Sequence, residues 1–175
     1  MASFQDRVIG ALRLQAATFE EVEHDASATA QAAIVVLAGT VARSLGWYYL
    51  GVMALLSSIV GALLGWVIAA LVVWIVGTRL FPGKNTEGDF GQVLRTLGFA
   101  QAPGVFAILG LIPRLGWLIG FAVGVWVLIG SVLAVKQALD YDDYLKPIVV
   151  CLIAGVAMVF VMMVISLIGI GASMW

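Results

Sequence analysis

The residues with the clearest capacity for chemistry are carboxylates and one imidazole within the first 25 residues. Glu20 and His24 are four residues apart, as are Glu21 and Asp25, and on a helix this spacing places each pair on one face. Two such side chains could share a metal ion, but a metal site needs further ligands from elsewhere. Because the chain has no second histidine, we expect no metal site and interpret these residues as a solvated acidic helix end.

A second acidic group, Asp140, Asp142 and Asp143, has the alternating look of a calcium-binding loop. The calcium-loop pattern also requires a glycine and a terminal glutamate, and neither is present at the required position. We therefore expect these aspartates to cap helices and to pair with Lys136 or Lys146.

The long apolar runs offer little for catalysis. Pumps and ion-coupled transporters usually place ionisable groups in the middle of the membrane, and the second to fifth runs have none there. With no nucleophile–base pair in these runs, we expect no enzyme activity and no cofactor. Cys151 lies in an apolar run and, as the only cysteine, excludes an internal disulfide. The polar groups available there are Thr40, Ser57, Gln101, Ser131 and Ser166.

Composition explains why these groups must be positioned by membrane helices. The 175 residues are 63% hydrophobic and 11% charged, whereas a soluble domain is nearer half apolar and a quarter charged. The net charge of −1 gives no reason to expect nucleic acid as a partner. We predict one all-α integral membrane domain over residues 26–175, preceded by a cytoplasmic segment over residues 1–25.

Five apolar runs predict five transmembrane helices. The third has 15 residues, about 22 Å as a straight helix, and Pro103 should kink it. Carbonyls freed by a proline must be satisfied within lipid, so this run should be sheltered inside the bundle. Gln101 could bond such a carbonyl, which we favour over a substrate contact. The predicted spans cover about residues 26–45, 50–77, 98–112, 115–135 and 148–170.

Residues 3–24 predict one amphipathic helix, with Ser3 and Asp6 as a capping box. Such a helix can lie in the membrane interface with its apolar face toward lipid. Alternatively, its apolar stripe packs on the cytoplasmic face of the protein itself. The stripe consists of Phe4, Val8, Ala11, Leu12, Phe19 and Val22.

Two stripes of small residues predict close helix packing, because small side chains let backbones approach. Packing of the second span against the fourth within one chain is the simpler interpretation. The alternative is that one stripe serves another protein. The stripes are Ser57, Gly61, Gly65 and Ala69 in the second span, and Gly116, Gly120 and Gly124 in the fourth.

The distribution of cations predicts the orientation. With five spans and a cytoplasmic N-terminus, seven cations lie inside, two lie outside, and the C-terminus is periplasmic, which agrees with the positive-inside rule. All ten acidic residues then also lie inside. We therefore expect a multi-pass protein of the bacterial inner membrane. The outside cations are Arg43 and Arg114; the inside ones are Arg7, Arg13, Arg79, Lys84, Arg95, Lys136 and Lys146.

One stretch resembles a known family. Residues 94–103 read LRTLGFAQAP, the run continues to Ile112-Pro113, Trp117 begins the next run, and residues 136–139 read KQAL. Together with the order of the spans, this resembles the prokaryotic branch of the Ypt-interacting protein (YIP) family. The resemblance implies a five-helix membrane domain with a cytoplasmic N-terminus. Eukaryotic relatives associate with Rab-type GTPases through a longer N-terminal region, which has no counterpart here, so GTPase binding is not carried over.

These features favour a membrane interaction or scaffold protein that assembles with itself or with a larger complex and has no chemistry of its own. Its partners would be membrane lipids and membrane proteins. The alternative is a small oligomeric permease, channel or lipid-handling protein that uses the third span, kinked at Pro103. A bound lipid, pigment or quinone stays open, because tryptophans such as Trp66, Trp74, Trp117 and Trp126 could line a pocket for one.

Overall fold

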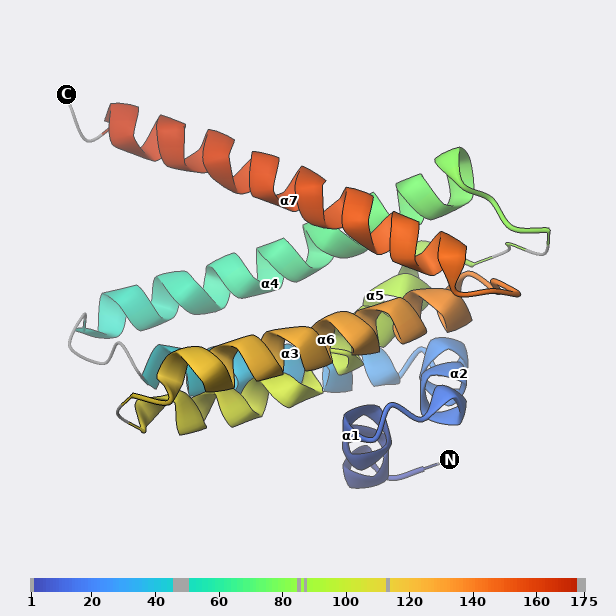
Figure 1. Ribbon diagram of the computed structural model, residues 1–175, viewed down its shortest axis with the longest axis horizontal. Coiled ribbons are helices and arrows are strands. Elements are labelled where there is room, and N and C mark those ends of the chain that lie inside the picture. The colour runs from blue at the N-terminus through green and yellow to red at the C-terminus, as the bar shows by residue number, and fades with distance from the viewer. Residues whose placement is uncertain (1, 46–50, 85, 87, 113, 173–175) are drawn as a thin grey trace.

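The computed structural model describes residues 2–45, 51–84, 86, 88–112 and 114–172 of the chain (Figure 1). Helices are the only regular elements in these residues, which agrees with the predicted all-α class. The α-helices are α1 (Phe4–Leu12), α2 (Ala16–His24), α3 (Ala28–Ser44), α4 (Gly51–Ile75), α5 (Phe90–Phe99), α6 (Gly116–Ala138) and α7 (Leu145–Ala172); a π-helix, η2 (Val76–Leu80), and a 3-10 helix, η3 (Ala102–Leu111), complete the order.

The N-terminal segment forms two short helices, so the prediction of a single helix over residues 3–24 was wrong. The capping box of Ser3 and Asp6 is confirmed at the start of α1. The chain then turns at Leu14, whose φ of 55° is left-handed, and the N–H of Gln15 donates to the carbonyl of Gly10. A Cβ at Gly10 would lie only 2.0 Å from Oγ1 of Thr18, so this glycine lets α2 fold back closely on α1.

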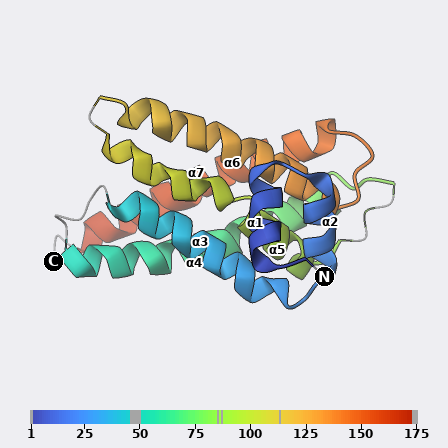
Figure 2. The ribbon, with the colours of Figure 1, turned by 90° about the horizontal axis from the view of Figure 1, so that it is seen from below.

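The apolar stripe of this segment packs on the protein itself. Phe19 and Val22 are fully buried, together with Val93 of α5 and Ala134 of α6. The ring of Phe4 meets Phe99 edge-on, with centroids 6.5 Å apart. Figure 2 shows α1 and α2 lying across the other helices at one end of the bundle. In the structure, the apolar stripe therefore packs on the protein itself, which is the second of the two interpretations.

Within the described residues, four stretches are long and apolar enough to cross a membrane: Val52–Leu80, Phe90–Leu111, Gly116–Ala138 and Leu145–Val164. The helix of the first predicted span, α3, has 17 residues and is about 26 Å long, shorter than a hydrocarbon core of about 30 Å. It is held to α4 by a hydrogen bond between the hydroxyls of Ser44 and Ser58.

The third span begins earlier than predicted. Asp89 accepts from the N–H of Gln92 and forms a capping box, so α5 starts at Phe90 and not near Gly98. From Ala102 the chain continues as the 3-10 helix η3, with Pro103 buried in its first turn. The segment packs on α3, α4 and α6. In its most apolar 18 residues 56% are buried, whereas 17–28% are buried in the corresponding stretches of the other three candidate spans. The predicted shelter for this span is confirmed.

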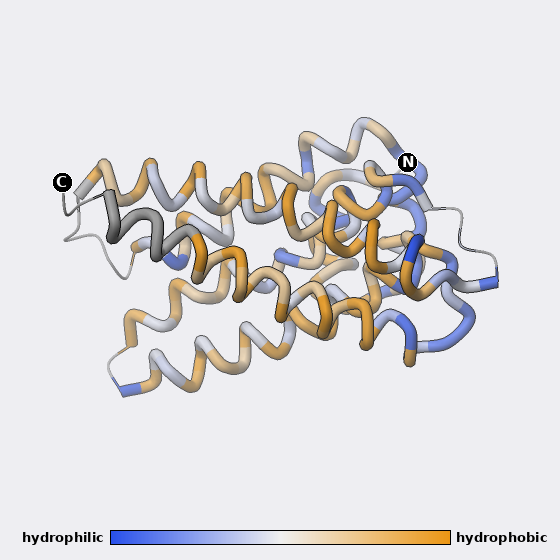
Figure 3. Tube along the Cα trace, turned by 90° about the horizontal axis from the view of Figure 1, so that it is seen from above, coloured by the Kyte–Doolittle hydropathy of each residue, from blue (hydrophilic) through white to orange (hydrophobic). Residues whose placement is uncertain are grey.

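The polar connections gather at one end of the molecule. The helices α1 and α2, the segment after η2 and the turn between α6 and α7 lie together there, and the turn between η3 and α6 lies at the opposite end (Figure 1). Figure 3 shows the hydrophilic residues concentrated at the end where the chain begins. The last helix starts at Leu145, slightly before the predicted 148, because Asp143 caps it by accepting from two backbone N–H groups.

Candidate functional site: the buried polar layer beneath the N-terminal helices

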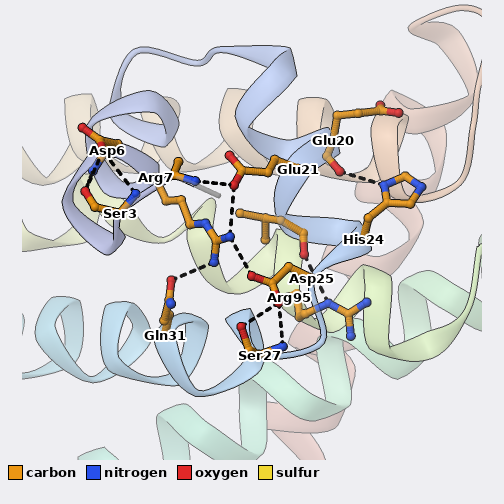
Figure 4. A network of polar contacts seen from close by, with 12 residues as sticks. Ser3, Asp6, Arg7, Glu20, Glu21, His24, Asp25, Ser27, Gln31 and Arg95 are labelled. Atoms are coloured by element: carbon orange, nitrogen blue, oxygen red, sulfur yellow. Dashed lines mark hydrogen bonds and ion pairs between the residues drawn. The ribbon is translucent and has the colours of Figure 1, made fainter.

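The side chain of Arg7 joins three helices from a fully buried position. Its Nη2 lies 2.6 Å from Oδ2 of Asp25 and 3.1 Å from Oε1 of Glu21 (Figure 4). Its Nη1 donates to Oε1 of Gln31, at 3.1 Å. Because these partners belong to α2, the α2–α3 connection and α3, one guanidinium positions α1 against both following helices.

Electrostatic interactions favour the charged state of both the Arg7 guanidinium and the Asp25 carboxylate. Burial disfavours the charge of Arg7, but hydrogen bonds from its guanidinium to Asp25 and Glu21 more than offset that cost and raise its pKa. The hydroxyl of Ser27, followed by Arg7, lowers the pKa of Asp25 to about 2. The ion pair is therefore fully charged at any physiological pH.

A second buried arginine, Arg95, connects the third span to α2. Its guanidinium donates to the backbone carbonyls of Val22 (3.3 Å from Nε) and Glu23. These carbonyls belong to the last turn of α2, where a cation is favoured by the helix dipole. Arg95 is the second residue of the LRTLGFAQAP stretch, so part of that motif has a structural role here.

The indole N–H groups of three tryptophans donate to backbone carbonyls of other segments. Trp126 donates to Leu12 (3.0 Å), Trp66 to Leu94 (2.9 Å) and Trp74 to Gly88 (3.0 Å). Trp126 also stacks on Phe106 with centroids 5.6 Å apart, whereas Trp117 is 76% exposed. The three hydrogen-bonded indoles therefore hold neighbouring segments of the chain together.

The acidic end of α2 contains Glu20 and His24, which the sequence pairs, and also Glu23, which the sequence analysis did not single out. The carboxyl group of Glu23 is only 2% exposed, and its Oε1 lies 3.3 Å from Nδ1 of His24. Its Oε2 is buried and has no hydrogen-bond partner among the described residues. Glu20 completes the cluster, since its backbone carbonyl lies 2.9 Å from the same Nδ1 (Figure 4) and its Oε2 accepts from Gln137.

Burial and neighbouring groups raise the pKa values of Glu23 and His24. Burial, followed by the charge of Glu20, raises the pKa of Glu23 to about 7. The carbonyl of Glu20 and the charge of Glu23 raise the pKa of His24.

The sequence does contain an indication that Glu23 is buried. Glu23 follows the buried Phe19 by four residues and so lies on the same helix face.

The predicted glycine stripes do not meet each other. Within the described residues, positions for a Cβ at Gly61, Gly120 and Gly124 have no atom within 4 Å, so these glycines face away from that part of the chain. A Cβ at Gly65 would lie 4.0 Å from the Cε of Met162 in α7, and a Cβ at Gly116 would lie 2.7 Å from the carbonyl oxygen of Gly110. The predicted packing of the second span against the fourth is therefore not formed at these glycines. Ser57 is exposed and Ala69 is half-buried on the first stripe.

The kink residues behave differently from expectation. The chain accommodates Pro103 by changing from an α-helix to a 3-10 helix, and the carbonyl of Gln101 accepts from the N–H of Gly104 at 2.8 Å. The half-buried side chain of Gln101 has no hydrogen bond within the part of the chain that the structure describes. The proposed amide–carbonyl bond of Gln101 is thus not formed.

The aspartates of the α6–α7 turn act partly as predicted. Asp143 caps α7, but the lysines bond carbonyls: Lys136 donates to Tyr141 and Lys146 to Pro82, each at 2.7 Å. The hydroxyl of Tyr141 donates to the carbonyls of Gly77 (3.1 Å) and Phe81 (2.9 Å), and burial raises its pKa to about 12. The turn therefore fixes the π-helix η2 at the end of the second span.

An apolar groove of about 510 Å³ lies between α6 and α7, where the α1–α2 turn also contributes to its wall. Almost all of its surface is hydrocarbon. It is lined by Leu14, Ala16, Leu128, Ile129, Val132, Leu133, Tyr144, Ile148, Cys151 and Leu152.

The chain matches the model of a known protein family. The family model described as the Yip1 domain matches residues 9–165, which is most of the chain. No curated protein and no solved structure matched. The match begins inside α1, two residues after Arg7, and ends inside α7, so it includes the polar partners of Arg7 in α2 and α3 and most of the apolar helices.

Proposed function

Because the chain belongs to the Yip1 domain family, we propose that it is a membrane interaction or scaffold protein that assembles with itself or with a larger membrane complex. It is a membrane protein with several apolar helices, four of them long enough to span a bilayer. Under this proposal it performs no catalysis, and its contribution is the surface that its helices offer to other helices. We further propose that it belongs to the prokaryotic branch and works in a bacterial inner membrane.

The observation that carries this proposal is the open space around the outward glycines. Gly61 of α4 and the pair Gly120 and Gly124 of α6 have no neighbour within 4 Å of a Cβ position among the residues that the structure describes. Glycine lowers helix propensity by about 1 kcal/mol relative to alanine, so it is costly where the chain itself gains no packing. In membranes, small residues let a second helix approach closely. A helix from another polypeptide would use the space that the chain leaves open.

The arrangement of charge supports the proposed topology. Among the described residues, the helical segments α3, α4–η2, α5–η3, α6 and α7 run between the two ends, and hydrophilic residues are concentrated at the end with α1 and α2 (Figure 3). We propose that all five cross the membrane, that this end is cytoplasmic and that the C-terminus is periplasmic. Arg43 and Arg114 then lie outside, as the positive-inside rule permits for a minority of cations.

The experiment is to fill the open space and to measure assembly. We expect the wild type, purified in mild detergent or crosslinked in native membranes, to form a stoichiometric assembly. Gly61→Ile and Gly120→Ile should weaken that assembly without unfolding the chain, because no atom of the described residues lies within 4 Å of either Cβ position. Val60→Ile and Val125→Ile, at exposed neighbouring positions, are the matched controls. Recovery of wild type only as a monomer, with no crosslinked partner, would overturn the proposal.

The groove between α6 and α7 favours a second candidate, a lipid-handling protein or a small permease. Its hydrocarbon lining and its volume of about 510 Å³ suit an acyl chain. In proteoliposomes, flux or lipid transfer above that of empty vesicles would favour this function, and Gln101→Leu or Pro103→Ala in the third span should change the rate. A rate equal to that of empty vesicles would exclude it.

A further inference from the structure

We propose that Glu20, Glu23 and His24 form a binding site for a divalent transition-metal ion, with Zn²⁺ as the type of ion. The three side chains lie on one face of the last turns of α2, at positions i, i+3 and i+4. One ligand atom from each lies within 4.8 Å of those of the other two. Zn–O and Zn–N bonds of about 2.0–2.2 Å are reached from such spacing by small rotations of the exposed Glu20 and His24 side chains.

The independent observation that indicates a cation is the carboxylate of Glu23. It is 2% exposed and directed at His24, yet its Oε2 has no partner in the described residues. A buried carboxylate oxygen without a partner is costly unless a proton or a cation compensates it. The buried guanidinium of Arg95 directs its N–H groups to the carbonyls of Val22 and Glu23, and therefore makes no hydrogen bond to this oxygen.

The donor set selects the kind of ion. Two carboxylates and one imidazole suit Zn²⁺ and its neighbours, whereas Mg²⁺ prefers a shell made only of oxygen. Nδ1 of His24 lies 3.3 Å from Oε1 of Glu23 and 2.9 Å from the carbonyl oxygen of Glu20, so an ion bound between the carboxylates would take the place of the hydrogen on Nδ1. Water can complete the coordination, since Glu20 and His24 are exposed on the outer side.

The surroundings hold one ligand in place. The amide of Gln137 donates to Oε2 of Glu20 at 2.9 Å and leaves Oε1 free to bind an ion. Hydrogen bonds of this kind to metal ligands typically affect affinity by about 10- to 100-fold. Because Gln137 belongs to α6, a bound ion would also link the end of α2 to the fourth span.

The test uses the full-length, tag-free protein in detergent micelles, stripped with EDTA and titrated with Zn²⁺ alone at pH 7.5. We expect one equivalent to bind and to raise the Tm. The affinity should fall at least about tenfold in Glu23→Gln and in His24→Ala, and more modestly in Gln137→Ala. Asp142→Asn, which removes an exposed carboxylate from the α6–α7 turn, is the matched control and should bind as the wild type does.

Two further readouts separate the site from adventitious binding. Co²⁺ should give d–d absorption bands that His24→Ala changes, and Mg²⁺ at the same concentration should produce no shift in Tm. The nearly isosteric Glu23→Gln keeps the fold, so its loss of Zn²⁺ binding reports on the ligand. Equal Zn²⁺ affinity in the wild type, Glu23→Gln and His24→Ala would overturn the proposal, as would a wild type that binds no Zn²⁺.

Discussion

The guanidinium of Arg7 and the carboxylate of Asp25 form a 2.6 Å ion pair, with the two side chains 2% and 11% exposed. The pair joins the first helix of the chain to the connection that leads into α3. Its partners Glu21 and Gln31 extend the same contact over α2 and α3. The N-terminal helices are thereby held on the bundle by a polar contact in addition to the apolar stripe.

Replacing Arg7 by methionine should release these helices. Breaking a buried ion pair from one side leaves an uncompensated charge, and we expect a loss of about 3 kcal/mol in the free energy of unfolding. Limited proteolysis should cut the chain near the α1–α2 turn much faster than in the wild type. Arg13→Met, which changes an exposed arginine just after α1, is the control and should leave cleavage unchanged.

Replacing Trp126 by phenylalanine should weaken the same docking more mildly. The ring can still stack on Phe106, but the carbonyl of Leu12 loses its donor, which costs about 1 kcal/mol. Hydrogen exchange of the α1 amides should accelerate accordingly. Trp117→Phe, at a highly exposed position, provides the comparison; similar acceleration in both variants would contradict the assigned role.

Glycines of the bundle should divide into two classes. A Cβ at Gly98 would lie 2.7 Å from that of Ala32 and 3.0 Å from the Trp66 ring, so Gly98→Ala should lower the free energy of unfolding by about 1–3 kcal/mol. Gly124→Ala meets only open space and should leave it unchanged or raise it by up to about 1 kcal/mol. Thermal unfolding followed by circular dichroism distinguishes these outcomes, and a larger loss at Gly124 would refute the assignment.

The stability of the metal-free protein should fall as the pH rises from 5 to 8. The pKa of Glu23 is about 7 in the fold against an ordinary 4.5, so the folded state holds a proton that the unfolded state releases in this window. The raised pKa of His24 acts in the same direction, since its stabilising charge is lost as the pH rises. Glu20 and Asp140 oppose the ionisation of Glu23, and Arg95 favours it.

The raised pKa of Glu23 also sets the size of the pH effect. A pKa difference of this size corresponds to a change of at most about 3 kcal/mol in the free energy of unfolding between pH 5 and pH 8. The Tm of the wild type, measured in EDTA, should therefore decrease over this range, and that of Glu23→Gln should decrease less. The interpretation fails if both proteins show the same pH dependence.

Much of the fold follows from local chemistry that can be read along the chain. The capping boxes of Ser3–Asp6 and of Asp89–Gln92 fix two helix starts, although Asp89 moves the third span to an earlier start than its apolar run indicates. Pro103 correctly marks the irregular third span. The break at Leu14 has no comparable signal, because it depends on α2 folding against Gly10.

The sequence by itself determined the all-helical membrane class, the sheltered third span and the family, because apolar length, proline and short motifs act locally. Only the tertiary structure decided which polar groups meet. Arg7 finds Asp25, Arg95 finds the end of α2, and Glu23 is buried because α2 packs on α5 and α6. The tertiary structure also leaves the space beside Gly120 open within the described residues, since whether a small residue packs depends on the path of every other helix. Spacing along one helix specifies a face, but the partner of that face depends on the arrangement of the whole chain.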